Sequence, residues 1–136
     1  TGAISHGALV ADRLELPFIY VRAGAKEHGL GNQIEGFYQA GQKVVVIEDL
    51  ISTGSSSLNA VKALRDKDCE VLGMTAIFTY EFKKSYDAFA AEKCTLHTLC
   101  NYTTLIETAL STGYITETDV DTLKKWRLDP ENWGIK

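Results

Sequence analysis

The chain has 136 residues, which is enough for one domain with a sizeable hydrophobic core. Hydrophobic residues make up 45% of the chain and charged residues 24%, a composition that is typical of globular proteins and excludes the disordered and fibrous classes. Acidic residues outnumber basic ones by 18 to 14. This net charge of −4 argues against a nucleic-acid partner, without excluding a local basic loop that binds an anionic small molecule.

The cysteines and the apolar runs indicate the cellular compartment in which the protein is expected. Cys69, Cys94 and Cys100 form an odd set without CxxC spacing, which favours reduced, buried thiols over metal ligands and predicts a cytoplasmic protein. No apolar run reaches the ~18 residues that a membrane span needs, so we expect no membrane partner. The chain opens on Thr1 rather than Met, and we therefore expect a domain that is N-terminally incomplete.

Hydrophobic periodicity predicts the elements of the first part of the chain. Helical spacing over residues 5–14, with Ser5 as a candidate N-cap, predicts a helix, and residues 18–21 form a short predicted strand. Residues 22–37 contain four glycines and no periodicity, which indicates a long loop. The apolar run over 43–48 predicts a strand that is buried on both faces, as in a parallel sheet.

Helices and strands continue to alternate after this strand. The predicted elements are a helix over 55–65, a strand over 70–80, a helix over 85–93, a strand over 95–99, and two helices capped by Asn101 and Thr116. Such alternation predicts an α/β fold, with an open, mostly parallel sheet flanked by helices. Because no linker or internal repeat interrupts the pattern, we expect residues 1–136 to form a single domain.

The segment VVVIEDLISTGSSS, residues 44–57, combines a strand, two acids and a helix start. Glu48 and Asp49 follow the apolar run, where carboxylates can ligate Mg²⁺, act as an acid/base pair, or accept hydrogen bonds from sugar hydroxyls. The glycine and small hydroxyl residues that follow let backbone N–H groups approach a phosphate at a helix N-terminus. Together these features indicate a ribose 5-phosphate site. The alternative is a solvated strand end followed by an ordinary N-cap turn.

This segment resembles the phosphoribosyl pyrophosphate (PRPP) signature of type I phosphoribosyltransferases. The resemblance implies that Glu48 and Asp49 bind the ribose hydroxyls. It also implies a loop that holds the 5-phosphate, formed by Ser52, Thr53, Gly54, Ser55 and Ser56. Mg²⁺ is implied as the cofactor, held mainly by PRPP and pyrophosphate oxygens rather than by protein side chains. The opening residues 1–4 resemble the end of the family's pyrophosphate-binding loop.

The glycine-rich loop narrows the resemblance. The run RAGAKEHG followed by GNQIEG is similar to the flexible catalytic loop of orotate phosphoribosyltransferases, which implies that Arg22, Lys26 and His28 act in catalysis together with Asp49. Cations aimed at a departing pyrophosphate lower the barrier, and a glycine-rich loop can close over the substrate. The resemblance further implies a homodimer whose loop reaches the neighbouring site. The alternative for these cations is a solvated charged loop.

Departures from the family concern the base. The N-terminal hood that contacts orotate is missing, and Tyr80 stands where many members place an arginine that grips the orotate carboxylate, so Tyr80 is a weak candidate base contact. The sequence thus predicts Mg²⁺-dependent transfer of phosphoribosyl from PRPP to orotate, giving orotidine 5-phosphate and pyrophosphate. The alternatives are a non-catalytic PRPP-binding regulatory module and a phosphoribosyltransferase that uses another base.

Overall fold

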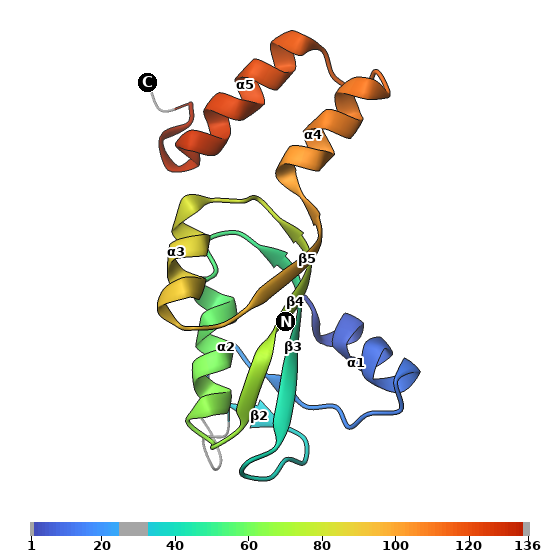
Figure 1. The fold of residues 1–136 in the computed structure, drawn as a ribbon, viewed down its shortest axis with the longest axis vertical. Helices are drawn as coiled ribbons and strands as arrows, with labels where there is room; N and C mark the ends of the chain where they lie inside the picture. The colour runs from blue at the N-terminus through green and yellow to red at the C-terminus, as the bar shows by residue number, and fades with distance from the viewer. Residues whose placement is uncertain (1, 25–32, 135–136) are drawn as a thin grey trace.

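The computed structural model of the protein describes residues 2–24 and 33–134. Helices and strands alternate along most of the chain (Figure 1). Their bounds are α1 Ile4–Arg13, β1 Tyr20–Val21, β2 Ile34–Glu35, β3 Lys43–Ile51, α2 Ser55–Arg65, β4 Glu70–Thr79, α3 Lys83–Ala91, β5 Leu96–Asn101, α4 Tyr102–Ser111, α5 Glu117–Leu128 and the short 3-10 helix η1 Pro130–Asn132.

The strands β3, β4 and β5 form a parallel sheet in that order. The register pairs Ile51 with Thr79 and Thr79 with Asn101, so the carboxyl ends of the three strands meet at one edge. Ligands of open α/β sheets bind beyond this edge. A second, antiparallel sheet joins β1 to β2, with Val21 opposite Ile34. The predicted α/β class with a parallel sheet flanked by helices is confirmed.

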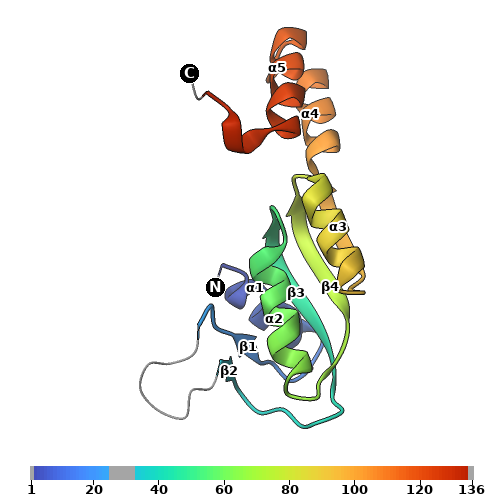
Figure 2. The ribbon, with the colours of Figure 1, turned by 90° about the vertical axis from the view of Figure 1, so that its left-hand side faces the viewer.

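The main core lies between the sheet and the helices α2 and α3. Ile51 and Val61 are fully buried there, and Phe89 of α3 packs in the same cluster with Met74 of β4. α1 lies on the opposite side of β3, where Gly7 approaches the ring of Phe18 and the side chain of Ile47. The helices therefore flank the sheet on both sides: Figure 1 shows α2 and α1 on opposite sides of β3 and β4, and Figure 2 views the molecule from the side of α2, with α1 behind.

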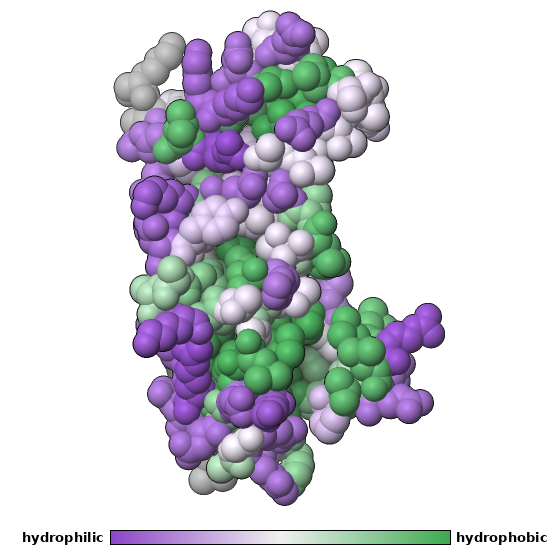
Figure 3. Space-filling view, viewed as in Figure 1, coloured by the Kyte–Doolittle hydropathy of each residue, from purple (hydrophilic) through white to green (hydrophobic). Residues whose placement is uncertain are grey.

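The prediction that β3 is buried on both faces is wrong. Val45 is 53% exposed, and Leu72 and Leu99 on the neighbouring strands are also exposed. α1 has ten residues and covers only part of this side of the sheet, so an apolar run along the strands does not guarantee a second covering layer. Figure 3 shows hydrophobic residues gathered over the strands and on α1.

Several predicted boundaries also move. β3 continues to Ile51 rather than ending at Glu48, because its pairing with β4 continues through Leu50 and Ile51. α1 begins at Ile4 with Ala3 as N-cap, so Ser5 lies inside the helix and does not cap it. The segment predicted as a loop over 22–37 contains β2. The helix predicted over 55–65 has those bounds in the structure.

The C-terminal helices are capped as predicted. The side chain of Asn101 accepts a hydrogen bond from the N–H of Thr104 at 2.8 Å, and Thr116 forms a capping box with Asp119. The two helices form a hairpin that extends beyond the sheet (Figure 1). Tyr102 and Trp126 join this hairpin to the end of the sheet through an aromatic cluster.

Candidate functional site

The acidic pair lies near the carboxyl end of β3. Ser57, in the first turn of α2, donates a hydrogen bond from its Oγ to Glu48 Oε2 at 3.0 Å, and the backbone N–H of Asp49 donates to Glu48 Oε1 at 3.2 Å. Asp49 Oδ1 accepts from the N–H of Leu50 at 2.8 Å. Its other oxygen faces Gly2, where an added Cβ would overlap Asp49 Oδ2. The pair is therefore held between the start of α2 and the N-terminal segment.

The environment separates the acidities of the two carboxyl groups. Burial raises the pKa of Glu48, and its hydrogen bond with the Asp49 side chain raises it further, while the Ser57 hydroxyl acts in the opposite direction. The same hydrogen bond with Glu48 lowers the pKa of Asp49, aided by the Leu50 N–H. As pH rises, Asp49 thus loses its proton before Glu48 does. The pair therefore offers two half-buried carboxyl groups of unequal acidity.

The turn between β3 and α2 forms a cradle at a helix N-terminus. Gly54 is the N-cap of α2 and has a φ of 82°, a left-handed conformation that favours glycine. As a glycine it has no side chain to occupy the first N–H groups of the helix, which attract anions together with the helix dipole. Ser55 and Ser56 are exposed there, and the hydroxyl groups of Thr53 and Ser55 lie 3.2 Å apart. This geometry suits a phosphate group.

The structure brings the acids and this cradle together. Ser57 belongs to the same helical turn as the exposed serines and touches Glu48, so both parts lie at one edge of the sheet. Sequence reasoning missed Ser57 because the run of three serines was interpreted as cap and phosphate loop alone. The sequence signal that could have identified Ser57 is its place on the apolar side of the helix, together with Leu58 and Val61, which predicts a buried hydroxyl.

Arg22 lies elsewhere in the chain. It follows β1, and its guanidinium pairs with Glu35 at 3.3 Å. The β1–β2 pair packs through Ile34 against Leu64, near the C-terminal end of α2. α2 has 11 residues and is therefore ~16 Å long, so the β1–β2 pair packs at the end of this helix that is opposite to the cradle. The other predicted loop cations, Lys26 and His28, lie outside the described residues.

Tyr80 lies at the expected edge, directly after β4. Its backbone N–H donates to the carbonyl of Ile51 at 3.1 Å. Its ring stacks on Phe82 at 5.3 Å and meets Trp126 edge-on at 5.5 Å. The ring thus helps to hold α5 against the sheet, and the predicted contact with a base stays a prediction.

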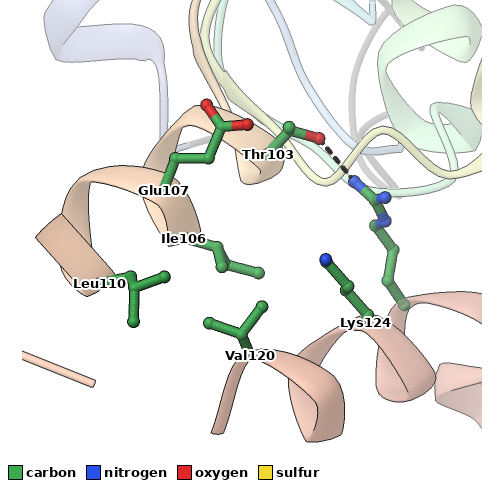
Figure 4. Close-up of a pocket in the computed structure, with 7 residues that line it drawn as sticks. Thr103, Ile106, Glu107, Leu110, Val120 and Lys124 are labelled. Carbon is green, nitrogen blue, oxygen red and sulfur yellow. Dashed lines mark hydrogen bonds between the residues drawn. The ribbon is translucent and has the colours of Figure 1, made fainter. Parts of the chain in front are cut away.

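Two hollows lie at the C-terminal hairpin, apart from the acids and the cradle. One has a volume of about 150 Å³ and lies between α4 and α5, as Figure 4 shows, with Ile106, Leu110 and Val120 in its wall. The other, of about 380 Å³, is lined by Glu81, Lys83, Tyr86, Thr103, Arg127 and Leu128. Neither contains the predicted phosphate or ribose contacts.

Within the described ranges 2–24 and 33–134, no three His, Cys, Asp or Glu side chains gather into a metal site. Nor does this part of the chain contain a helix that is both long and apolar enough to cross a bilayer.

A family model described as "Phosphoribosyl transferase domain" matches residues 1–101. The chain belongs to the phosphoribosyl transferase family. It is 58% identical over 131 residues to the orotate phosphoribosyltransferase of Bacillus caldolyticus, and this alignment covers 96% of the chain and 64% of that relative. The chain thus spans just under two thirds of the length of the curated relatives that it matches. The resemblance to orotate phosphoribosyltransferases expected from the sequence is confirmed.

Solved phosphoribosyltransferase structures agree with this assignment. The crystal structure of orotate phosphoribosyltransferase from Aeropyrum pernix superposes with a TM-score of 0.68 at 26% identity, covering 79% of this chain and 59% of that one. The Mycobacterium tuberculosis orotate phosphoribosyltransferase in complex with PRPP gives a TM-score of 0.54 at 28% identity, covering 65% and 49% of the two chains.

Proposed function

We propose that the full-length protein transfers a phosphoribosyl group from PRPP to orotate and releases orotidine 5-phosphate and pyrophosphate. The observation that carries this proposal is the junction of β3 and α2. There, an acidic pair suited to a sugar diol touches the same helical turn that forms an anion cradle. The 58% identity to an orotate phosphoribosyltransferase supports orotate as the acceptor.

In this reaction Glu48 and Asp49 accept hydrogen bonds from the two ribose hydroxyls. Ser52 to Ser56 hold the 5-phosphate with their N–H and hydroxyl groups. Fixing both ends of the sugar places C1 at a set distance from the edge of the sheet, which favours the orientation needed for reaction. The bond from C1 to the pyrophosphate oxygen loosens, its electron pair leaves with pyrophosphate, and an orotate ring nitrogen forms the new bond to C1 as its N–H proton is lost to solvent. This scheme requires no covalent protein nucleophile.

The position of Arg22 supports a shared active site in a homodimer. Arg22 stands at the base of the glycine-rich loop, at the opposite end of α2 from the cradle. We expect the loop that starts there to serve the site of a second subunit, as the resemblance to orotate phosphoribosyltransferases implies. Arg22, Lys26 and His28 would then stabilise the charge on the departing pyrophosphate of the neighbour.

Mg²⁺ fits this site as an ion that arrives with the substrate. The described residues lack a three-ligand cluster, whereas Mg²⁺ commonly keeps water and phosphate oxygens as most of its ligands. The ion would supply charge neutralisation for the pyrophosphate. Residues 1–136 would form a single phosphoribosyltransferase core that acts in the cytoplasm, without a membrane or nucleic-acid partner.

The decisive experiment measures orotidine 5-phosphate formed from orotate, PRPP and Mg²⁺ by the full-length protein, with uracil and a purine base in parallel. Product from orotate alone is the expected result. Product formed from another base, and not from orotate, would identify that base as the acceptor. PRPP binding without product from any base would indicate a regulatory PRPP-binding module instead.

A matched pair of variants tests the loop. Lys26→Ala should reduce turnover strongly and leave PRPP affinity nearly unchanged, because the contact forms with the leaving charge. Lys43→Ala, at the exposed opposite end of β3, provides the control and should leave both quantities unchanged. Equal loss of affinity and turnover in Lys26→Ala would contradict the catalytic role of this residue.

A further inference from the structure

Ser57 of α2 is only 2% exposed, and its hydroxyl donates a hydrogen bond to Glu48 Oε2 on the neighbouring strand β3. Two other helical serines behave differently. Ser85 Oγ donates to the carbonyl of Phe82, three residues earlier, and Ser111 donates to that of Thr108. Such local bonds are the common solution for a hydroxyl in a helix. Ser57 instead meets a carboxylate that lies nine residues earlier in the chain.

We propose that Ser57 is a positioning residue that holds the Glu48 carboxylate in the orientation required for the ribose hydroxyls. This inference rests on the proposed function, since it assigns a role within the same PRPP site. It adds a residue that the PRPP signature, read as two acids and a phosphate loop, does not include.

The contacts of Glu48 support this role. Its Oε2 accepts from Ser57 and its Oε1 from the N–H of Asp49, and the carboxyl group also forms a hydrogen bond with the Asp49 side chain. A carboxylate has about four acceptor directions, so capacity remains for a sugar hydroxyl. Two fixed donors restrict the rotation of a flexible side chain before the substrate arrives, and this lowers the entropic cost of binding.

The place of Ser57 in α2 gives the hydrogen bond a second consequence. Ser57 is the third residue of the helix whose first N–H groups form the anion cradle. The contact therefore ties the carboxylate of the ribose site to the turn of the phosphate site. A displacement of this turn would move both sites together, which suits a ligand whose sugar and 5-phosphate lie a fixed distance apart.

The same hydrogen bond acts on the ionisation of Glu48. The Ser57 hydroxyl favours the charged carboxylate and so lowers its pKa, against burial and against the neighbouring Asp49, which both raise it. Asp49 is the charged group among the described residues that acts on Glu48, and Ser57 is the polar group that faces it from α2. Removal of the hydroxyl should therefore raise the pKa of Glu48.

The test compares Ser57→Ala with Ser85→Ala in the full-length protein. Both changes remove a buried hydroxyl and one hydrogen bond, but only the first alters Glu48. Calorimetry should show PRPP binding about tenfold weaker in Ser57→Ala, as expected for a lost hydrogen bond to a charged group, and unchanged in Ser85→Ala. Ser57→Thr retains the hydroxyl and should retain affinity if the variant folds.

Two further readouts separate positioning from general loss of structure. In a Glu48→Ala background, Ser57→Ala should change PRPP affinity less than about twofold, because Ser57 acts through Glu48. Carbon-13 NMR of the Glu48 carboxyl should show titration at higher pH in Ser57→Ala than in the unaltered protein. If Ser57→Ala weakened PRPP binding equally with and without Glu48→Ala, the proposal would be overturned. An unchanged titration of Glu48 in Ser57→Ala would overturn it as well.

The outcomes also distinguish this proposal from the proposed function. If the unaltered protein binds no PRPP, the proposed function fails and the sugar-binding role of Ser57 fails with it. If the protein binds PRPP and converts orotate, but Ser57→Ala matches Ser85→Ala in affinity, only the role of Ser57 is refuted. The NMR titration decides in either case whether Ser57 holds Glu48.

Discussion

Gly54→Ala should destabilise the protein and weaken PRPP binding together, because two independent costs arise at this position. Gly54 has a φ of 82°, and an L-residue with a Cβ in the left-handed region costs about 1–2 kcal/mol. The added Cβ would also lie 2.8 Å from Cε2 of Phe89, which is shorter than any ordinary contact. Phe89 is 4% exposed and packed in the main core, so its ring has little room to retreat.

The magnitude follows from these two terms. Overpacking of a filled core costs roughly 1–3 kcal/mol, so the total loss of unfolding free energy should be about 2–5 kcal/mol. Urea denaturation measures this loss, and calorimetry with PRPP reports the cradle. Because Gly54 is the N-cap of α2, any shift that relieves the contact with Phe89 moves the first N–H groups of the helix away from the phosphate position.

Gly113→Ala provides the matched control. Gly113 also has a positive φ, of 73°, but an added Cβ would meet nothing within 4 Å there. This variant should lose only the conformational term of about 1–2 kcal/mol and should bind PRPP normally. Equal destabilisation by the two substitutions would refute the contact with Phe89, and normal PRPP affinity in a folded Gly54→Ala variant would refute the link between this turn and the phosphate.

Three other predictions concern the acids and a helix cap. Gly2→Ala should raise the KM for PRPP in steady-state assays, because the added Cβ overlaps Asp49 Oδ2 and must displace one of the two groups, whereas an unchanged KM would show that the N-terminal segment yields freely. Asn101→Ala should lower the unfolding free energy by about 1 kcal/mol through loss of the cap on the N–H of Thr104, and Asn101→Asp should restore it in denaturant titrations. Burial raises the pKa of Glu48 above its ordinary value of 4.5. The contribution of the protonated Glu48 to the free energy of unfolding is therefore fully present below pH 4.5 and is lost as the pH rises through the raised pKa. Glu48→Gln should remove this loss, and parallel pH dependences of stability for variant and parent would contradict it.

Most of the helices and strands could be predicted from local patterns in the sequence. Strand and helix periods predicted the alternation of β3, α2, β4, α3 and β5, and side-chain capping at Asn101 and Thr116 was predictable because a cap depends on residues only three positions away. The end of β3 was mispredicted because the strand continues wherever its partner continues. The pairing of Ile51 with Thr79 is a property of two segments, and neither segment alone reveals it.

Burial of the sheet shows a second limit of local patterns. The residues of β3 carry the apolar run that is typical of a strand covered on both sides, yet Val45 is half exposed. An apolar run indicates that a surface is suited to burial, but whether that surface is covered depends on where other segments lie. Leu99 is 79% exposed on the same sheet. Such residues mark where the described chain leaves the sheet open.

The candidate site divides in the same way between local and distant relations. The cradle could be anticipated because Gly54 and the serines around it are neighbours in sequence, and the acids could be anticipated because they end an apolar run. The contact between Ser57 and Glu48 depends on how α2 returns along β3, and the separation of Arg22 from the cradle depends on where β1 and β2 pack. A motif therefore suggests candidate ligand groups, whereas the contacts that orient them and their separation in space depend on the fold.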